Sequence, residues 1–131
     1  MNKKFDSETL YERLYNFALR CQRLTNLLPK TSYNLVYNRQ LTRSSGSMGA
    51  NYIEALEGLS KKDFIHRLRI CRKETRESVH WLRLIKDSNA DLPEITKEAQ
   101  KLIEEGQEIK KIFSSSILTS EKQIKTNSEI I

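Results

Sequence analysis

Apolar side chains recur at alternating spacings of three and four residues along four long stretches of the chain. This period matches the turn of an α-helix and differs from the strict alternation of a half-buried strand. The sequence therefore predicts helices at about residues 6–28, 32–57, 60–87 and 91–118. Connections this short force consecutive helices to run in opposite directions, so the predicted fold is all-α, an up-down-up-down antiparallel four-helix bundle.

Residues with strong helix-capping preferences stand at the predicted boundaries. The expected N-caps are Asp6 or Ser7, Thr31 or Ser32, Ser60, and Asp91. Pro93 then falls in the first turn of the fourth helix, where its missing N–H costs nothing. We expect Gly58 to end the second helix in the left-handed conformation that glycine tolerates, with Leu59 packed back on the last turn.

A chain of 131 residues suits one domain, since domains typically have about 100–150 residues. From Thr119 onward the sequence is rich in Ser, Lys, Asn and Gln. We therefore predict a bundle domain over residues 1–118 and a flexible tail over 119–131. No apolar run reaches the roughly 18 residues of a membrane span, and no apolar stretch follows the N-terminal lysines as in a signal peptide. A cytoplasmic protein without a membrane partner is expected.

The net charge of +6 is concentrated on the third helix, which has nine lysines and arginines against four acidic residues. One face of this helix has the apolar spacing of a core seam. The opposite face has a basic residue or a histidine at every position of one stripe. The members of this basic stripe are Lys62, His66, Arg69, Lys73, Arg76, His80 and Arg83.

A helix rises about 1.5 Å per residue, so the basic stripe is about 30 Å long. A ridge of this length can follow a phosphate backbone, which makes the stripe a candidate nucleic-acid-binding surface. The other interpretation is a solvated face charged for solubility, although mixed signs are expected there. The sequence leaves both interpretations open.

The middle of the second helix is unusually rich in small residues, from Ser44 to Ala50. Small residues allow another helix to approach closely, and several polar residues share one face of this helix. We expect a structural polar network inside the bundle or at a subunit interface. Its predicted members are Arg43, Ser44, Ser47, Asn51, Glu54 and Glu77.

An enzymatic interpretation would make Glu54 a general base, which needs a partner acid, a nucleophile or a metal set. The sequence has a single Glu-x-x-His motif, Glu77 to His80, and not the pair of such motifs that a di-iron site needs. It also has no glycine-rich phosphate loop and no serine-nucleophile motif. Cys21 and Cys71 are too few for a zinc site and are expected as small buried residues. We therefore expect no enzymatic activity, no metal and no cofactor.

Several apolar and aromatic residues lie outside the main seams. Trp81, Tyr52 and Tyr33 are expected in the core or at an interface, with stacking on nucleic-acid bases as the less favoured interpretation. A protomer this small also leaves apolar residues that symmetric association would bury. They are Leu35, Val36, Ile65, Val79, Leu84, Ile103 and Ile112.

Three motifs in order resemble those of a known family. They are Arg43–Ala55, Ser60–Phe64, and Lys73–Ser78 leading into Trp81 and Leu82. Over roughly residues 5–118 the chain resembles the 23S rRNA-intervening-sequence proteins, keeping the motif residues Arg43, Ser47, Asn51, Glu54, Asp63, Glu77 and Trp81. The resemblance implies a four-helix bundle that assembles as a homopentamer, a symmetric ring. Members are encoded within ribosomal RNA gene insertions or elsewhere in bacterial genomes, without an established biochemical role or catalytic residues.

The accessory variability determinant (Avd) proteins of diversity-generating retroelements are more distantly similar. Those pentamers have basic surfaces, bind nucleic acid and pair with a reverse transcriptase. The chain does not resemble Avd closely enough to imply a reverse transcriptase partner. The sequence therefore predicts a non-catalytic homo-oligomer that binds RNA or DNA backbone through the basic stripe. The alternative is a protein-interaction scaffold with an acidic partner.

Overall fold

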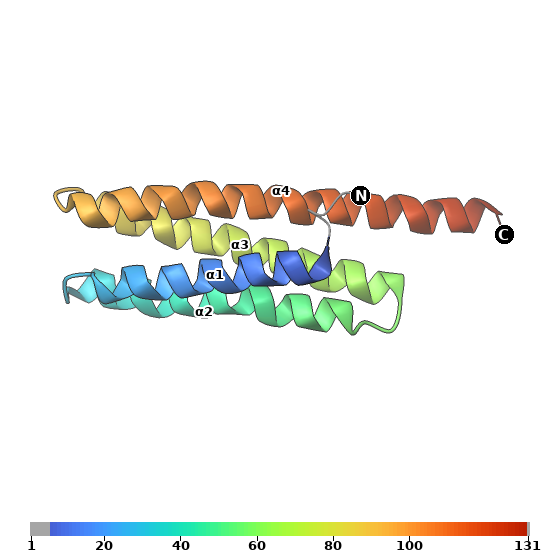
Figure 1. Ribbon diagram of the computed structural model, residues 1–131, viewed down its shortest axis with the longest axis horizontal. Helices are drawn as coiled ribbons and strands as arrows, with labels where there is room; N and C mark the ends of the chain where they lie inside the picture. The colour runs from blue at the N-terminus through green and yellow to red at the C-terminus, as the bar shows by residue number, and fades with distance from the viewer. Residues whose placement is uncertain (1–5, 131) are drawn as a thin grey trace.

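The computed structural model describes residues 6–130, and the side chains of residues 6–128. It contains four helices: α1 (Ser7–Asn26), α2 (Ser32–Leu56), α3 (Lys61–Ser88) and α4 (Pro93–Ile130). The prediction of an all-α chain with four helices is confirmed, and no strand occurs within residues 6–130. Each connection reverses the direction of the chain, so the four helices lie side by side along one long axis (Figure 1).

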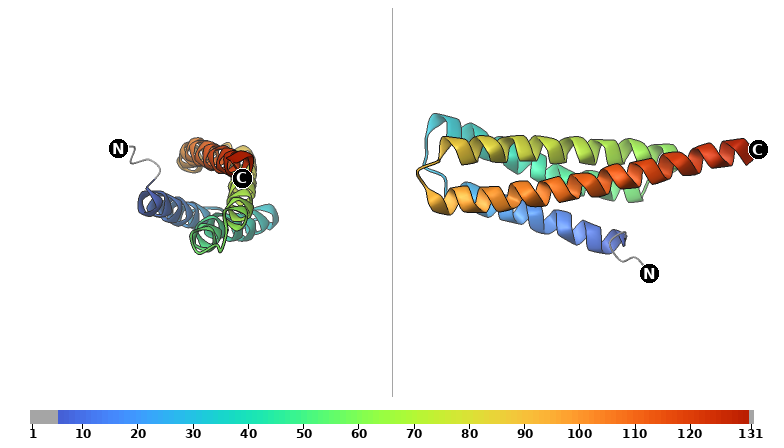
Figure 2. Two further views of the ribbon diagram at one scale, coloured as in Figure 1. Left: turned by 90° about the vertical axis from the view of Figure 1, so that its right-hand side faces the viewer. Right: turned by 90° about the horizontal axis from the view of Figure 1, so that it is seen from above.

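The helices pack unequally. α3 lies between α2 and α4 and packs extensively on both, whereas α1 packs on α2 and less closely on α4. Figure 2 shows the reason, since α1 diverges from α4 toward its N-terminus. The outer face of α3, opposite the core, therefore remains free of other helices.

Three of the predicted N-caps are confirmed. In each, the side-chain oxygen of the cap accepts a hydrogen bond from a backbone N–H in the first turn. These bonds join Asp6 to Glu8 at 2.9 Å, Thr31 to Asn34 at 3.1 Å, and Ser60 to Asp63 at 3.1 Å. The starts of the first three helices were therefore predictable from local capping chemistry.

Three local expectations were wrong. Gly58 has no positive φ, and Leu59 is 97% exposed instead of packed on α2. The backbone N–H of Gly58 donates to the Ala55 carbonyl at 3.2 Å, and a Cβ at position 58 would lie 3.1 Å from that oxygen. Glycine therefore allows the chain to pass close to this carbonyl. At the start of α4, Leu92 instead of Asp91 precedes the first helical residue, Pro93, and its carbonyl accepts from Thr96 at 3.1 Å.

The predicted end of the fourth helix at Leu118 was also wrong. α4 continues to Ile130 and extends beyond the α2–α3 connection (Figure 1). Its helical spacing continues past Leu118, because Ile117 and Ser120 are buried and Ile124 packs against the core. The boundary at residue 118 thus falls inside a helix, and the polar composition of residues 119–130 was a misleading sign of irregular structure.

The core takes apolar side chains from all four helices and includes the predicted seam of α3. Both cysteines are buried as expected, and burial raises the pKa of the Cys21 and Cys71 thiols to about 12. We expected Ile65, Val79 and Ile103 to be buried by association between copies. They are instead buried within the protomer, so they are not available for such contacts. Of that predicted set, Leu35 and Val36 are exposed.

Helices approach one another closely at a glycine of α4. A Cβ built on Gly106 would lie 2.6 Å from Cγ2 of Val79 on α3 and 3.6 Å from the ring of Phe17 on α1. Gly46 of α2 differs, because a Cβ there would meet nothing within 4 Å. The small residues of α2 therefore do not all serve packing inside this protomer.

Candidate nucleic-acid interface

The outer face of α3 presents the whole basic stripe to solvent. All seven members, from Lys62 to Arg83, are exposed, while the seam on the opposite face is buried. The caps at Ser60 and the packing of α3 between α2 and α4 fix this orientation. The helical spacing thus correctly predicted which residues of α3 face outward.

Few carboxylates stand near the stripe. The acidic residues exposed on α3 are Asp63 and Asp87, one near each end of the helix. Arg69 forms an ion pair with Glu121 of α4, and within the part of the chain whose side chains are described no other stripe member is in an ion pair. Between His66 and Arg83 the exposed residues of α3 are all basic or histidine, and the partly exposed Glu77 is the acidic residue beside them.

Arg43 of α2 pairs with both carboxylates that flank the middle of the stripe. Its guanidinium donates to Glu74 at 3.2 and 3.4 Å and to Glu77 at 3.5 Å. Burial raises the pKa of Glu74, the neighbouring Glu77 raises it further, and the positive charge of Arg43 acts in the opposite direction. Arg43 thereby ties α2 to α3 and reduces the negative charge beside the stripe.

A hollow of about 380 Å³ lies on α3 in the middle of the stripe. Its lining consists of Arg69, Arg72, Lys73, Arg76, Glu77 and His80. Arg72 was not among the predicted site residues, and it donates to Oγ of Ser114 on α4 at 3.3 Å. A concave site with several guanidinium and ammonium groups suits a phosphate group, since arginine donates two parallel hydrogen bonds to phosphate oxygens.

The residues of the predicted polar network make separate contacts. Oγ of Ser44 lies 2.8 Å from Oγ of Ser78 in the core, and Arg43 pairs with Glu74 and Glu77 as described. Farther along α2, Asn51 donates to the Ser47 carbonyl at 2.9 Å. The α3 partners Ser78 and Glu74 were missed as members of the network, although their positions within the heptad spacing of α3 would have placed them facing α2.

Arg67 of α3 is the remaining missed partner. It donates to Oδ1 of Asn51 at 3.3 Å and lies 3.9 Å from the Glu54 carboxylate. A hollow of about 340 Å³ surrounds Glu54, lined also by Glu57, Asp63 and His66, and these four side chains are exposed. Among residues 6–128, no three His, Cys, Asp or Glu side chains lie in an arrangement that could hold a metal ion, these four included.

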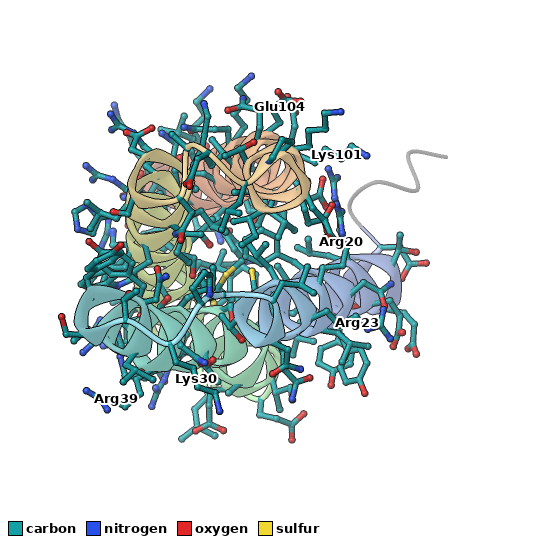
Figure 3. The ribbon with its side chains drawn as sticks, turned by 90° about the vertical axis from the view of Figure 1, so that its left-hand side faces the viewer. Arg20, Arg23, Lys30, Arg39, Lys101 and Glu104 are labelled. Atoms are coloured by element: carbon teal, nitrogen blue, oxygen red, sulfur yellow. The ribbon has the colours of Figure 1, made fainter. Side chains whose placement is uncertain are left out.

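The face formed by α1 and α4 contrasts with the stripe. Arg13 donates to both carboxylate oxygens of Glu105 at 2.7 and 2.9 Å, and Arg20 donates to Glu98 at 3.2 and 3.4 Å. Figure 3 shows Arg20 and Lys101 on this side, whereas Arg39 of α2 projects from the opposite side of the bundle. Arg13 and Arg20 of the α1–α4 face are thus partners of specific carboxylates.

A further surface feature is an apolar groove of about 420 Å³ between α1 and α2. Tyr15 and Ile53, which are 53% and 46% exposed, stand at its sides. Gly46, Gly49 and Ala50 lie in it, so the surface of α2 has no large side chains there. The groove provides a smooth, mostly apolar surface next to α2.

The three aromatic residues named from the sequence occupy different environments. Tyr52 is buried against Phe113 in the core, which confirms a core position. Trp81 is half-buried, and its Nε1 is the only buried side-chain polar atom without a hydrogen-bond partner within residues 6–128. Tyr33 is 43% exposed, so it belongs to the surface of the protomer.

None of the helices in the described part of the chain has a segment both long and apolar enough to cross a membrane.

Residues 7–115 match the family described as 23S rRNA-intervening sequence protein. No curated protein shows significant similarity to the chain.

A solved structure gives the same fold. It is a crystal structure of a protein of unknown function from the S23 ribosomal protein family of Bacteroides thetaiotaomicron VPI-5482. The two chains are 30% identical and superpose with a TM-score of 0.72, over 82% of this chain and 97% of the other.

Proposed function

The chain belongs to the 23S rRNA-intervening sequence protein family, and from this premise we propose that it is a non-catalytic, homo-oligomeric protein of the cytoplasm that binds nucleic acid. The basic stripe contacts the phosphate backbone of RNA or DNA. The protomer is an up-down-up-down bundle, and its copies assemble as a symmetric ring, a homopentamer. The stripe then repeats around the ring as a multivalent basic surface.

One observation carries this proposal. Seven exposed basic or histidine side chains follow about 30 Å of α3, and a single ion pair, Arg69 with Glu121, engages them within the described side chains. Free cationic groups at this spacing displace the counterions of a nucleic acid, which is the main source of sequence-independent affinity. The hollow lined by Arg72 and Lys73 adds a concave place for a phosphate.

The experiment is a salt-dependent binding titration against RNA and DNA. The stripe variant has Arg69→Glu, Lys73→Glu and Arg76→Glu together. We expect its affinity to fall by about 100-fold near 0.1 M salt, and the slope of log affinity against log salt to fall by about 2–3 units, because three phosphate contacts are lost.

A matched control has the same net charge as the stripe variant, but its three charge reversals lie on the α1–α4 face. It has Arg23→Glu, Lys97→Glu and Lys101→Glu, three exposed residues that line one hollow between α1 and α4. We expect it to bind nearly as the wild type does. Equal losses in the two variants would show that only net charge matters and would reject the stripe as the binding site. The scaffold alternative would be supported if a pull-down with this chain recovered a single acidic protein after nuclease treatment and the chain itself had no affinity for nucleic acid.

The α1–α2 groove supports the proposed association. Its exposed apolar side chains and the open surface at Gly46 suit a second copy of the chain, since a helix can approach closely where no side chain intervenes. Gly46→Trp adds a bulky ring to the groove at a position where a Cβ meets nothing within 4 Å, so we expect a smaller assembly with unchanged helix content. Light scattering that reports a wild-type monomer at micromolar concentration would reject the ring.

A further inference from the structure

Four aromatic rings form a continuous row across α2 and α3. The ring centroids of Tyr33 and Tyr37 lie 5.9 Å apart, those of Tyr37 and Trp81 6.2 Å, and those of Trp81 and His80 4.8 Å. We call Tyr33, Tyr37, Trp81 and His80 the aromatic row. Separations of this size are typical of interacting aromatic pairs, so the rings support one another.

The row ends in exposed rings and is held in the middle by buried contacts. Tyr33 is 43% exposed and His80 is exposed, while Tyr37 and Trp81 are half-buried. The Tyr37 hydroxyl lies 3.3 Å from Oγ of Ser88 on α3. The two central rings therefore fix the position of the two outer rings, which face solvent.

The row meets the basic stripe at His80, which belongs to both. Arg76 and Arg83 lie one helical turn to either side of His80 on α3, and both are exposed. Exposed cationic groups of α3 thus flank the aromatic row at its His80 end.

We propose that the aromatic row and the basic stripe together form a binding site for single-stranded nucleic acid. The inference rests on the proposed function and narrows its ligand. Phosphates lie along the stripe, and bases stack on the exposed rings of Tyr33 and His80. Aromatic faces beside a cationic track bind single strands in this way, because an unpaired base exposes its face whereas a duplex conceals it.

The test compares one short sequence as single-stranded RNA, single-stranded DNA and RNA duplex, at fixed salt. Tyr33 lies outside the stripe, so Tyr33→Ala removes a stacking face and no charge. We expect about a fivefold or greater loss of affinity for the single strands and an unchanged affinity for the duplex. Comparison of the RNA and DNA arms shows which single strand is preferred.

Two control variants isolate the ring. Tyr33→Phe keeps the aromatic face and is expected to bind as the wild type does. Leu118→Ala removes another exposed apolar side chain, 57% exposed on α4, and should leave all affinities unchanged. Trp81 is the only tryptophan of the chain, so its fluorescence reports directly on the row. We expect single strands to change this fluorescence and the duplex to leave it nearly constant.

Failure of this inference is distinguishable from failure of the proposed function. If wild-type protein binds duplex as tightly as single strands, and the stripe variant weakens both, the stripe binds nucleic acid and the row does not. If Tyr33→Ala changes the size of the assembly instead of the affinity, the row is a protein interface and the inference is wrong. If wild-type protein binds none of the three probes, both proposals are rejected.

Discussion

The outer face of α3 and the face formed by α1 and α4 both have basic residues, yet they use them differently. On the α1–α4 face, Arg13 and Arg20 each donate to both oxygens of a glutamate on the neighbouring helix. On α3, the only ion pair of the stripe among the side chains of residues 6–128 joins Arg69 and Glu121. The first arrangement connects two helices of one protomer, and the second leaves positive charge available to an external partner.

The comparison has an energetic consequence. Paired charges that are partly buried contribute to stability, since hydrogen bonds to charged groups are stronger than neutral ones. A row of like charges repels itself and slightly opposes the folded state. The stability of the protomer therefore does not explain the stripe, whereas the proposed binding to phosphate would.

The largest expected effect is a difference in the free energy of unfolding between a charge reversal on the α1–α4 face and one on the stripe. Arg13→Glu places a carboxylate beside the partly buried Glu105, so we expect the free energy of unfolding to fall by about 1–2 kcal/mol. Lys73→Glu relieves repulsion on an exposed face and should change it by about 0.5 kcal/mol or less. Urea denaturation at fixed protein concentration measures both. Equal losses would contradict the distinction between the faces.

A smaller effect should appear at the border between the two arrangements, where Arg43 holds Glu74. Arg43→Ala leaves a buried carboxylate without its cation, and we expect the free energy of unfolding to fall by about 0.5–1 kcal/mol near neutral pH, since Arg43 is half-exposed. In an E74Q background the same change should cost much less. A similar loss in both backgrounds would show that Arg43 acts through other contacts.

The pH dependence of this loss follows from the raised pKa of Glu74. A carboxyl whose pKa is higher in the folded state than in the unfolded state binds its proton more tightly when the protein is folded. The protonated carboxyl therefore contributes fully to stability at a pH below its ordinary pKa of 4.5. This contribution is lost as the pH rises through the pKa of the folded state. Removing Arg43 raises that pKa further. The gap between wild type and Arg43→Ala should therefore widen as the pH rises, and should close in acid.

The smallest effect concerns Arg69, the stripe member whose ion pair with Glu121 is seen among the described side chains. Glu121→Gln removes the carboxylate beside Arg69, so we expect affinity for nucleic acid to rise about two- to threefold with little change in stability. Binding titrations at low and moderate salt would detect the difference. An unchanged affinity would mean that Arg69 does not contact the nucleic acid.

Much of the fold could be predicted because its signals are local. The apolar spacing gave the helices, and cap residues such as Thr31 and Ser60 gave three of their starts. The failures involve partners distant in sequence. The polar residues after Leu118 indicated irregular structure, whereas Ser120 and Ile124 meet the core and Glu121 meets Arg69 on α3.

The candidate site divides in the same way. The exposed stripe needed only the helical period of α3, so each of its members was predictable. The aromatic row was not, because Tyr33 and Tyr37 lie far from Trp81 in the sequence and meet it only when α2 packs on α3. The pairing of Arg43 with Glu74, which reduces the negative charge beside the stripe, likewise required that packing.

The sequence by itself determined that the chain forms long amphipathic helices and that one of them carries positive charge along a single face. Periodicity suffices for this, since the helical turn decides which side chains share a face. Only the tertiary structure decided which charges are neutralised. An arginine and a glutamate pair when two helices bring them within a few ångströms, as Arg13 and Glu105 do, and spacing along one helix contains no information about that distance.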